Sequence, residues 1–133
     1  MESACKVAIK SERDIVVARQ KGRTMATDLG FSVGNATLIA TAISELARNI
    51  ISYAGTGEIS MEVVRNSDRT GILIIASDRG PGIPDLPLAL RDGFSTSGSL
   101  GIGLPGARRL MDEFAIDSEP GRGTIVTVTK WKF

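Results

Sequence analysis

The sequence predicts an α+β two-layer sandwich of the α/β class, in which a mixed, largely antiparallel sheet carries helices on one face. The 133 residues are enough for one domain, over residues 1–133, and too few for two. An apolar fraction of 42% and a charged fraction of 23% are typical of globular proteins. Strand and helix patterns follow in the order β-α-α-β-β-loop-α-β-β, which favours antiparallel neighbours.

Each element follows from a local pattern in the chain. Apolar residues alternate in the strands, and apolar or small residues recur every three or four positions in the helices. Ser11 and Asp14 mark the start of the first helix, Gly30 its end, and Ala54-Gly55 the end of the second. The predicted elements are a strand over 6–10, helices over 15–30 and about 33–53, strands over 58–65 and 71–78, a helix over about 104–114, a short strand over 115–119 and a last strand over 124–131.

Composition excludes several classes of function. The chain has no histidine, which excludes histidine-based triads, His-ligated zinc and phosphohistidine in this chain. Its single cysteine, Cys5, excludes an internal disulfide and a multi-cysteine metal site. A net charge of +1 provides no electrostatic footprint for nucleic acid. No apolar run approaches the ~18–20 residues of a membrane helix and no signal-peptide pattern occurs, so we expect a cytoplasmic protein without membrane or nucleic-acid partners.

Glycine and proline gather in one segment. Seven of the 15 glycines and four of the five prolines lie between residues 80 and 106, and a loop of that length is usually functional or disordered. Gly98, Gly101 and Gly103 lead into a helix with Pro105 in its first turn, an arrangement typical of a phosphate cradle. Gly101 to Gly106 also spells the dinucleotide fingerprint, but no strand precedes it and too few residues follow. The Walker pattern is absent.

The second predicted helix carries a candidate catalytic pair. Glu45 and Asn49 lie four residues apart and therefore project as neighbours. The carboxylate can accept a proton from a hydroxyl, and the amide oxygen can bind Mg²⁺. The alternative is that Glu45 pairs with Arg48 or Arg19 on a solvated surface.

Two further motifs lie at strand ends. Asp78 ends a buried strand and is followed by Gly80 and Gly82. This pattern is typical of a turn; alternatively, Asp78 accepts a hydrogen bond inside a pocket while the glycines leave the backbone open to a flat ligand. Gly123-Thr124 begins the last strand and, alone, indicates a hairpin turn.

Together, four motifs in this order resemble the nucleotide-binding motifs of the GHKL, or Bergerat-fold (HATPase), superfamily, which includes gyrase B, Hsp90, MutL and the histidine kinases. The resemblance covers nearly the whole chain. At this length the chain is most similar to the anti-sigma-factor-like serine/threonine kinases, among them the switch kinases of stressosomes. The motifs are Glu45-x-x-x-Asn49, Asp78-x-Gly80-x-Gly82, Gly98-x-x-Gly101-x-Gly103 and Gly123-Thr124.

The resemblance implies ATP and Mg²⁺ as cofactors and assigns roles to these positions. Asp78 accepts from the adenine amino group with Thr124 beside it, and Glu45 accepts the proton of the incoming hydroxyl. The other implied ligands are Gly80 and Gly82 at the base, Gly98, Gly101 and Gly103 at the phosphates, and Asn49 at Mg²⁺.

The segment over about 84–100 matches the family's nucleotide lid, and we expect it to be mobile without nucleotide. It departs from the family pattern because residues 84–99 contain no lysine that could reach the γ-phosphate. The candidate cations for that charge are Arg79, Arg91, Arg108 and Arg109.

The implied function is an ATP-dependent protein serine/threonine kinase. By resemblance, it phosphorylates STAS-domain partners of a stressosome and then, by partner switching, activates an effector such as a PP2C-type phosphatase. One alternative is an anti-sigma factor of the same superfamily that binds a sigma factor in an ATP-dependent manner. A detached histidine-kinase catalytic domain and a catalytically inactive scaffold are further alternatives.

Overall fold

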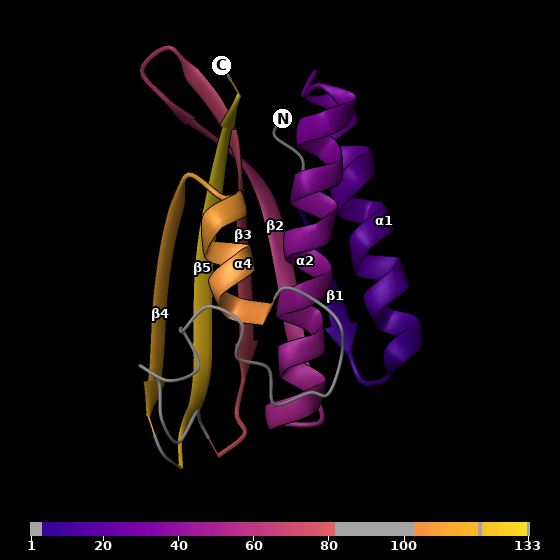
Figure 1. The fold of residues 1–133 in the computed structure, drawn as a ribbon, viewed down its shortest axis with the longest axis vertical. Helices are drawn as coiled ribbons and strands as arrows, with labels where there is room; N and C mark the ends of the chain where they lie inside the picture. The colour runs from indigo at the N-terminus through magenta and orange to yellow at the C-terminus, as the bar shows by residue number, and fades with distance from the viewer. Residues whose placement is uncertain (1–3, 82–102, 120, 133) are drawn as a thin grey trace.

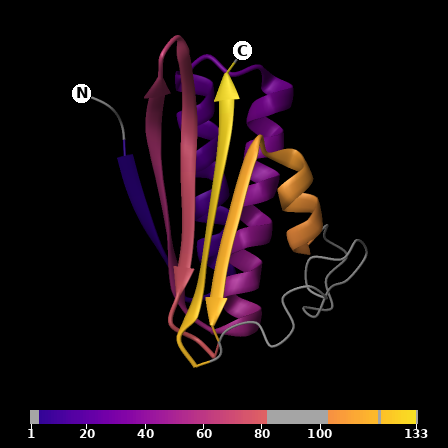
Figure 2. The ribbon, with the colours of Figure 1, turned by 90° about the vertical axis from the view of Figure 1, so that its left-hand side faces the viewer.

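A computed structural model of the chain describes residues 4–81, 103–119 and 121–132, and these residues form two layers (Figure 1). The helices cover one face of a single sheet, as the side view in Figure 2 makes plain. The elements are β1 (Ala4–Ile9), α1 (Glu12–Asp28), α2 (Val33–Tyr53), β2 (Gly57–Asn66), β3 (Arg69–Asp78), α4 (Gly103–Leu110), β4 (Glu113–Glu119) and β5 (Gly123–Lys132).

The five strands lie in the order β1-β2-β3-β5-β4. Every neighbouring pair in this sheet is antiparallel. The last strand, β5, lies between β3 and β4, so that Asp78 on β3 lies opposite Thr124. The predicted α+β sandwich is therefore confirmed, and its topology places the carboxyl end of β3 beside the amino end of β5.

The core lies between the helices and the sheet face that they cover. Met61, Ile74 and Val128 lie in one row across β2, β3 and β5 and are almost completely buried. On α2, the predicted apolar stripe is also buried, with each side chain at most 2% exposed. That stripe consists of Ile39, Ile43, Leu46 and Ile50. Burying it against the sheet fixes which side of α2 can face a ligand.

Local hydrogen bonds define where the first two helices begin. The Asp14 carboxylate accepts from the backbone N–H groups of Lys10 at 2.8 Å and Ser11 at 3.1 Å, as the sequence pattern predicts. Ser32 accepts from the backbone N–H of Asn35 at 3.1 Å and so starts α2. These bonds satisfy donors that a helix start leaves without partners.

The third helix is shorter than the sequence predicts. It was expected over about 104–114, but α4 ends at Leu110, and Phe114 belongs to β4, opposite Val128. The cause is Asp112, whose backbone N–H donates to the Thr129 carbonyl and whose carboxylate accepts from the Trp131 N–H at 2.7 Å. These bonds to β5 hold the chain in a sheet connection that a further helical turn would break.

Trp131 on β5 is fixed by side chains from the two neighbouring strands, β3 and β4. Its indole N–H donates to the Glu113 carboxylate at 2.7 Å, and the Arg69 guanidinium lies 4.2 Å from its ring centre. Such a cation–π contact stabilises a ring that is only 7% exposed. The cluster anchors the end of β5 that lies far from Thr124.

Within the described ranges, no helix has the length and apolar character needed to cross a membrane. The same residues contain no group of three or more acidic or cysteine side chains that could hold a metal ion.

Candidate active site

A small cavity lies between α2, α4 and the helix-covered face of β3 and β5. Its volume is about 20 Å³, room for roughly one water molecule. Three of the residues predicted from the sequence, Asn49, Asp78 and Thr124, line it together. The full lining is Leu46, Asn49, Ile50, Tyr53, Ala76, Asp78, Leu104, Thr124 and Val126. The structure therefore brings polar groups from three distant motifs onto one mainly apolar pocket.

Glu45 lies beside this cavity, where α2 meets the start of α4. It is only 9% exposed, and its Oε2 accepts from the backbone N–H of Gly103 at 3.1 Å. Gly103 is the first residue of α4, so the carboxylate lies at the positive end of that helix. This bond joins the second-helix motif to the glycine-rich motif across 58 positions of sequence.

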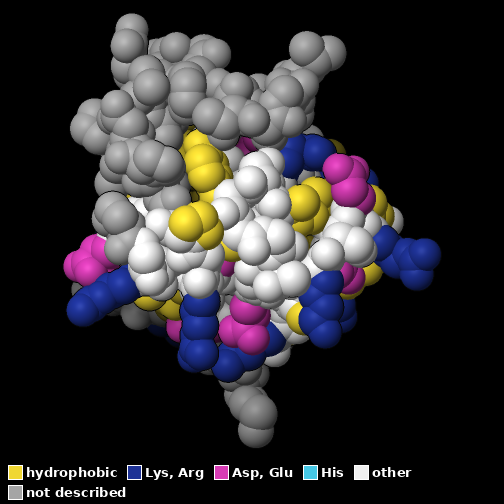
Figure 3. All heavy atoms as spheres, turned by 90° about the horizontal axis from the view of Figure 1, so that it is seen from below, with side chains coloured by type: hydrophobic (Ala, Val, Ile, Leu, Met, Phe, Trp, Pro, Cys, Tyr) yellow, Lys and Arg dark blue, Asp and Glu magenta, His cyan; other side chains and the backbone are white. Residues whose placement is uncertain are grey.

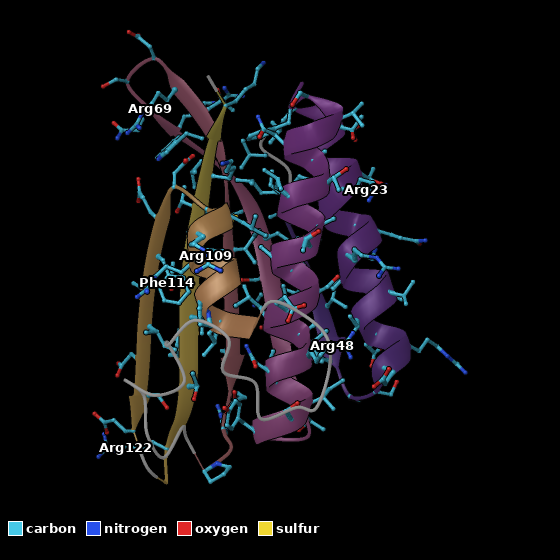
Figure 4. The ribbon with its side chains drawn as sticks, viewed as in Figure 1. Arg23, Arg48, Arg69, Arg109, Phe114 and Arg122 are labelled. Carbon is cyan, nitrogen blue, oxygen red and sulfur yellow. The ribbon has the colours of Figure 1, made fainter. Side chains whose placement is uncertain are left out.

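The alternative pairing of Glu45 with Arg48 does not describe the site. Arg48 extends from α2 toward α1 (Figure 4), and its Nη1 lies 3.9 Å from Glu12 Oε1. That ion pair is exposed and adds little stability. Glu45, by contrast, faces α4 from the buried side of α2.

Asn49 carries a polar atom that the described residues leave without a partner. Its Nδ2 is buried and makes no hydrogen bond there. Leaving such an atom unpaired costs roughly 1–3 kcal/mol, so buried orphans of this kind call for an explanation. An acceptor atom in the adjoining cavity, from a water or a ligand, would supply one, and the Oδ1 of the same carboxamide is an oxygen of the kind that Mg²⁺ prefers.

Asp78 forms both the turn and part of the pocket. Its Oδ1 accepts from the backbone N–H of Gly80 at 2.9 Å, which is the predicted turn chemistry, while its side chain also lines the cavity. Gly80 lies so close to the end of α2 that a Cβ there would overlap Ala54. Glycine at this position therefore lets β3 and α2 meet, and so fixes one wall of the site.

Thr124 lies opposite Asp78 and is 6% exposed. Its Oγ1 lies 2.8 Å from the hydroxyl oxygen of Ser118 on β4, a residue that sequence reasoning missed. The signal that could have found it is the tight turn between β4 and β5, which sets Ser118 opposite Thr124. Gly123 precedes Thr124 with φ +111°, and a Cβ there would overlap the Asp78 carbonyl.

Several predicted residues cannot be placed. Gly82, Gly98, Gly101, Arg91 and the segment 84–100 lie outside the described residues. Of the candidate cations, Arg79 is exposed beside Asp78, while Arg108 and Arg109 are exposed on α4. Figure 4 places Arg109 on α4 and Arg122 near the β4–β5 turn.

A second, larger hollow of about 760 Å³ lies at the same end of the sheet. It also includes Asp78 and Thr124, and charges of both signs surround it. From below, basic and acidic side chains intermingle around the rim of this end (Figure 3). Besides Asp78, the residues that contribute charge are Lys10, Glu58, Arg79, Asp117, Glu119 and Arg122. Their mixed signs favour no single class of ion.

Comparison with known sequences identifies the family of the chain. Residues 34–132 match the family model described as histidine kinase-, DNA gyrase B-, and HSP90-like ATPase. The chain is 55% identical over 94% of both chains to the serine/threonine-protein kinase RsbT of Bacillus subtilis. It is 31% identical to the anti-sigma F factor of Caldanaerobacter subterraneus subsp. tengcongensis, over 86% of this chain and 82% of that protein.

Comparison with solved structures supports the fold. The RsbU and RsbW domains of Rv1364c from Mycobacterium tuberculosis superimpose with a TM-score of 0.64 at 19% identity, over 98% of this chain and 33% of that chain. The mycobacterial sensor histidine kinase MprB gives a TM-score of 0.55 at 17% identity, over 97% of each chain.

The predicted enzyme class, a protein serine/threonine kinase, is confirmed by the relative at 55% identity. The match over residues 34–132 includes both the Glu45–Asn49 helix and the strands that carry Asp78 and Thr124. The chain thus belongs to the histidine kinase-, DNA gyrase B- and HSP90-like ATPase family, in its branch of small serine/threonine kinases and anti-sigma factors.

Proposed function

We propose that the chain, as one kinase domain over residues 1–133, transfers the γ-phosphoryl group of ATP to a serine or threonine of a STAS-domain stressosome partner. It then acts by partner switching on an effector such as a PP2C-type phosphatase, in the cytoplasm. The observation that carries the proposal is the meeting of Glu45, the orphaned Asn49 amide and the Asp78–Thr124 pair between α2 and α4.

The chemistry of the residues present fits a magnesium nucleotide, although the cavity of about 20 Å³ has to widen before it can admit a purine. Asp78 and Thr124 offer polar atoms at the edge of an otherwise apolar pocket, as recognition of a flat purine requires. The amino end of α4 is suited to phosphate oxygens through backbone N–H groups other than that of Gly103, which donates to Glu45. In this proposal Gly98 and Gly101 would complete the cradle, and Gly80 and Gly82 would border the base. Asn49 would hold Mg²⁺, which when bound neutralises charge on the phosphates.

Glu45 is the proton acceptor in this proposal. The partner's hydroxyl oxygen bonds to the γ-phosphorus, the bond from that phosphorus to the β–γ bridging oxygen breaks, and ADP leaves. The hydroxyl proton passes to the Glu45 carboxylate, which the Gly103 N–H already holds in place. Because phosphoryl transfer depends mainly on positioning and charge stabilisation, a small domain can suffice when a partner presents the hydroxyl.

The test is phosphorylation of a purified STAS-domain partner with Mg-ATP, followed by mass spectrometry of the partner. Glu45→Gln keeps the shape and an acceptor oxygen for Gly103 but removes the base. We expect it to slow transfer roughly 10²–10⁴-fold while ATP binding, measured by calorimetry, is retained. The matched control is Glu12→Gln, which changes an exposed carboxylate of α1 and should leave both quantities unchanged.

Normal phosphorylation by the Glu45→Gln variant would remove the assigned role of Glu45. Absence of any adenine-nucleotide binding by the unmodified protein would overturn the function itself.

The second candidate is an anti-sigma factor that binds its sigma factor in an ATP-dependent manner. It is favoured by several relatives at 29–32% identity that are named anti-sigma F factors. Pull-down against a sigma factor and against a PP2C-type phosphatase, each with and without ATP, separates the two functions. ATP-dependent capture of the sigma factor alone would favour the anti-sigma role.

A further inference from the structure

We infer that Ser118 is a positioning residue that orients the Thr124 hydroxyl toward the purine edge and thereby contributes to recognition of adenine. This inference rests on the proposed function, because it deepens the role of the same pocket. Ser118 does not line the cavity, whereas Thr124 does, so Ser118 acts through Thr124.

The first step is geometric. Asp78, Thr124 and Ser118 occupy one row across β3, β5 and β4, because the register pairs Asp78 with Thr124 and Thr124 with Ser118. All three side chains therefore project from the same face of the sheet, the face that α2 and α4 cover. Asp78 and Thr124 line the cavity, whereas Ser118 lies next to Thr124 on β4 and is not part of the lining.

The second step concerns the hydroxyl proton of Thr124. The Ser118 and Thr124 oxygens are 2.8 Å apart, and either can be the donor. A hydroxyl has one proton. When Ser118 donates, the Thr124 proton is available to a ligand acceptor; when Thr124 donates, only its lone pairs are available. Since Thr124 is 6% exposed, water has little access to replace Ser118.

The third step is the chemistry of the base. Adenine carries a donor amino group at C6 and, beside it, the acceptor nitrogen N1. A carboxylate at Asp78 suits the amino group, and a donated Thr124 proton suits N1. Guanine reverses both atoms, with an acceptor at C6 and a donor at N1. Ser118 donating to Thr124 therefore gives the row the acceptor–donor pattern that matches adenine.

The experiment compares ATP with 1-deaza-ATP, in which the N1 nitrogen is replaced by C–H. Dissociation constants for both are measured by calorimetry with Mg²⁺, and the ratio of the two isolates the contact to N1. A neutral hydrogen bond changes a dissociation constant by about two- to twelvefold, so we expect the unmodified protein to favour ATP by that order.

Three variants test Ser118, among them the shape-matched threonine and valine, and a fourth variant is the control. Ser118→Ala removes the hydroxyl, and we expect most of the preference for ATP over 1-deaza-ATP to be lost. Ser118→Thr retains the hydroxyl and should retain the preference, whereas Ser118→Val, of the same shape as threonine, should lose it. Ser60→Ala removes a hydroxyl from β2, where the alternation of that strand places Ser60 on the other face of the sheet, and should change nothing.

The possible outcomes distinguish the positioning role of Ser118 from the proposed kinase function. An unchanged ratio in Ser118→Ala, an equal loss for both nucleotides, or a valine variant that behaves as threonine overturns the positioning role and leaves the kinase proposal intact. So does an unmodified protein that binds both nucleotides equally. Failure of the unmodified protein to bind ATP at all overturns the proposed function instead, and with it this inference.

Discussion

At the scale of single residues, the site combines one satisfied carboxylate with one unsatisfied amide. Glu45 is buried but accepts from Gly103, whereas the Asn49 Nδ2 has no partner among the described residues. These two neighbours on α2 thus differ in the free-energy cost of their burial, because only Glu45 has a hydrogen-bond partner to offset the loss of water. The unsatisfied one is the better indicator of a ligand.

Asn49→Ala is expected to abolish the binding of Mg-ATP while it changes the stability of the ligand-free protein only slightly. Without ligand, removal of an unpaired buried amide relieves a desolvation cost and leaves a small void, so the free energy of unfolding should change by no more than about 1 kcal/mol. Stabilisation by Mg-ATP should disappear. Urea unfolding with and without Mg-ATP measures both quantities. Thr37→Ala, which removes an exposed hydroxyl of α2, serves as the control. A large loss of stability without ligand would mean that Asn49 is structural.

Asp78→Asn is expected to retain the fold and weaken nucleotide binding. The amide oxygen can still accept from the Gly80 N–H, but an NH₂ group replaces the second acceptor oxygen. Because hydrogen bonds to charged groups are worth about 1.5–3 kcal/mol, we expect the dissociation constant for ATP to rise by about ten- to a hundredfold. Calorimetry measures it, with Asp117→Asn, at an exposed position of β4, as the control. Unchanged affinity would remove Asp78 from the base site.

At the scale of elements, the close approach of β3 and β5 depends on a glycine. Gly121 and Gly123 both have positive φ, at +84° and +111°, but a Cβ meets nothing within 4 Å at Gly121 and overlaps the Asp78 carbonyl at Gly123. A comparison of Gly121 with Gly123 therefore separates the cost of a positive φ, which both share, from the cost of steric overlap, which only Gly123 has.

Gly123→Ala should destabilise the protein more than Gly121→Ala. The strain of positive φ costs about 1–2 kcal/mol at either position. Overlap with the β3 backbone should add at least about 1 kcal/mol at Gly123, because a packed backbone cannot yield freely. The free energies of unfolding in urea provide the comparison. Equal losses would mean that β3 and β5 can separate without cost.

Elements governed by local pattern were predicted well from the sequence, whereas those governed by distant pairing were not. The α2 stripe and the Asp14 start of α1 depend on residues within four positions, and both are confirmed. The end of α4 depends on Asp112 bonding to Trp131 on β5, which no local pattern contains. Helical periodicity therefore continued wrongly through Phe114.

The candidate site follows the same division. Glu45 and Asn49 are neighbours by helical spacing, and Asp78 ends a recognisable strand. Ser118 is positioned only by the register between β4 and β5, and Glu45 meets Gly103 only through tertiary packing. Sequence alone could name the motifs but not the contacts that join them.

At the scale of the whole molecule, one continuous core joins the helices to the sheet. Apolar residues from all the described elements except β4 belong to it, and β4 contributes partly buried side chains packed against it. Trp131, the single tryptophan, is fixed near one end of the sheet and the candidate site lies toward the other.

We expect urea unfolding to follow one cooperative transition. Trp131 fluorescence and far-ultraviolet circular dichroism should give the same midpoint, because a single core leaves no part to melt separately. Mg-ATP at about a hundred times its dissociation constant should raise the free energy of unfolding by about 2.7 kcal/mol in both signals. Two midpoints that differ between the probes would show that the helices or the sheet unfold independently.

The row formed by Asp78, Thr124 and Ser118 has a practical consequence. Because continuous strand pairing holds its backbone, changes to these three side chains should alter the base preference without moving the strands. A small combinatorial library at these positions is therefore a compact starting point for an orthogonal variant that accepts a synthetic nucleotide and ignores the cellular pool.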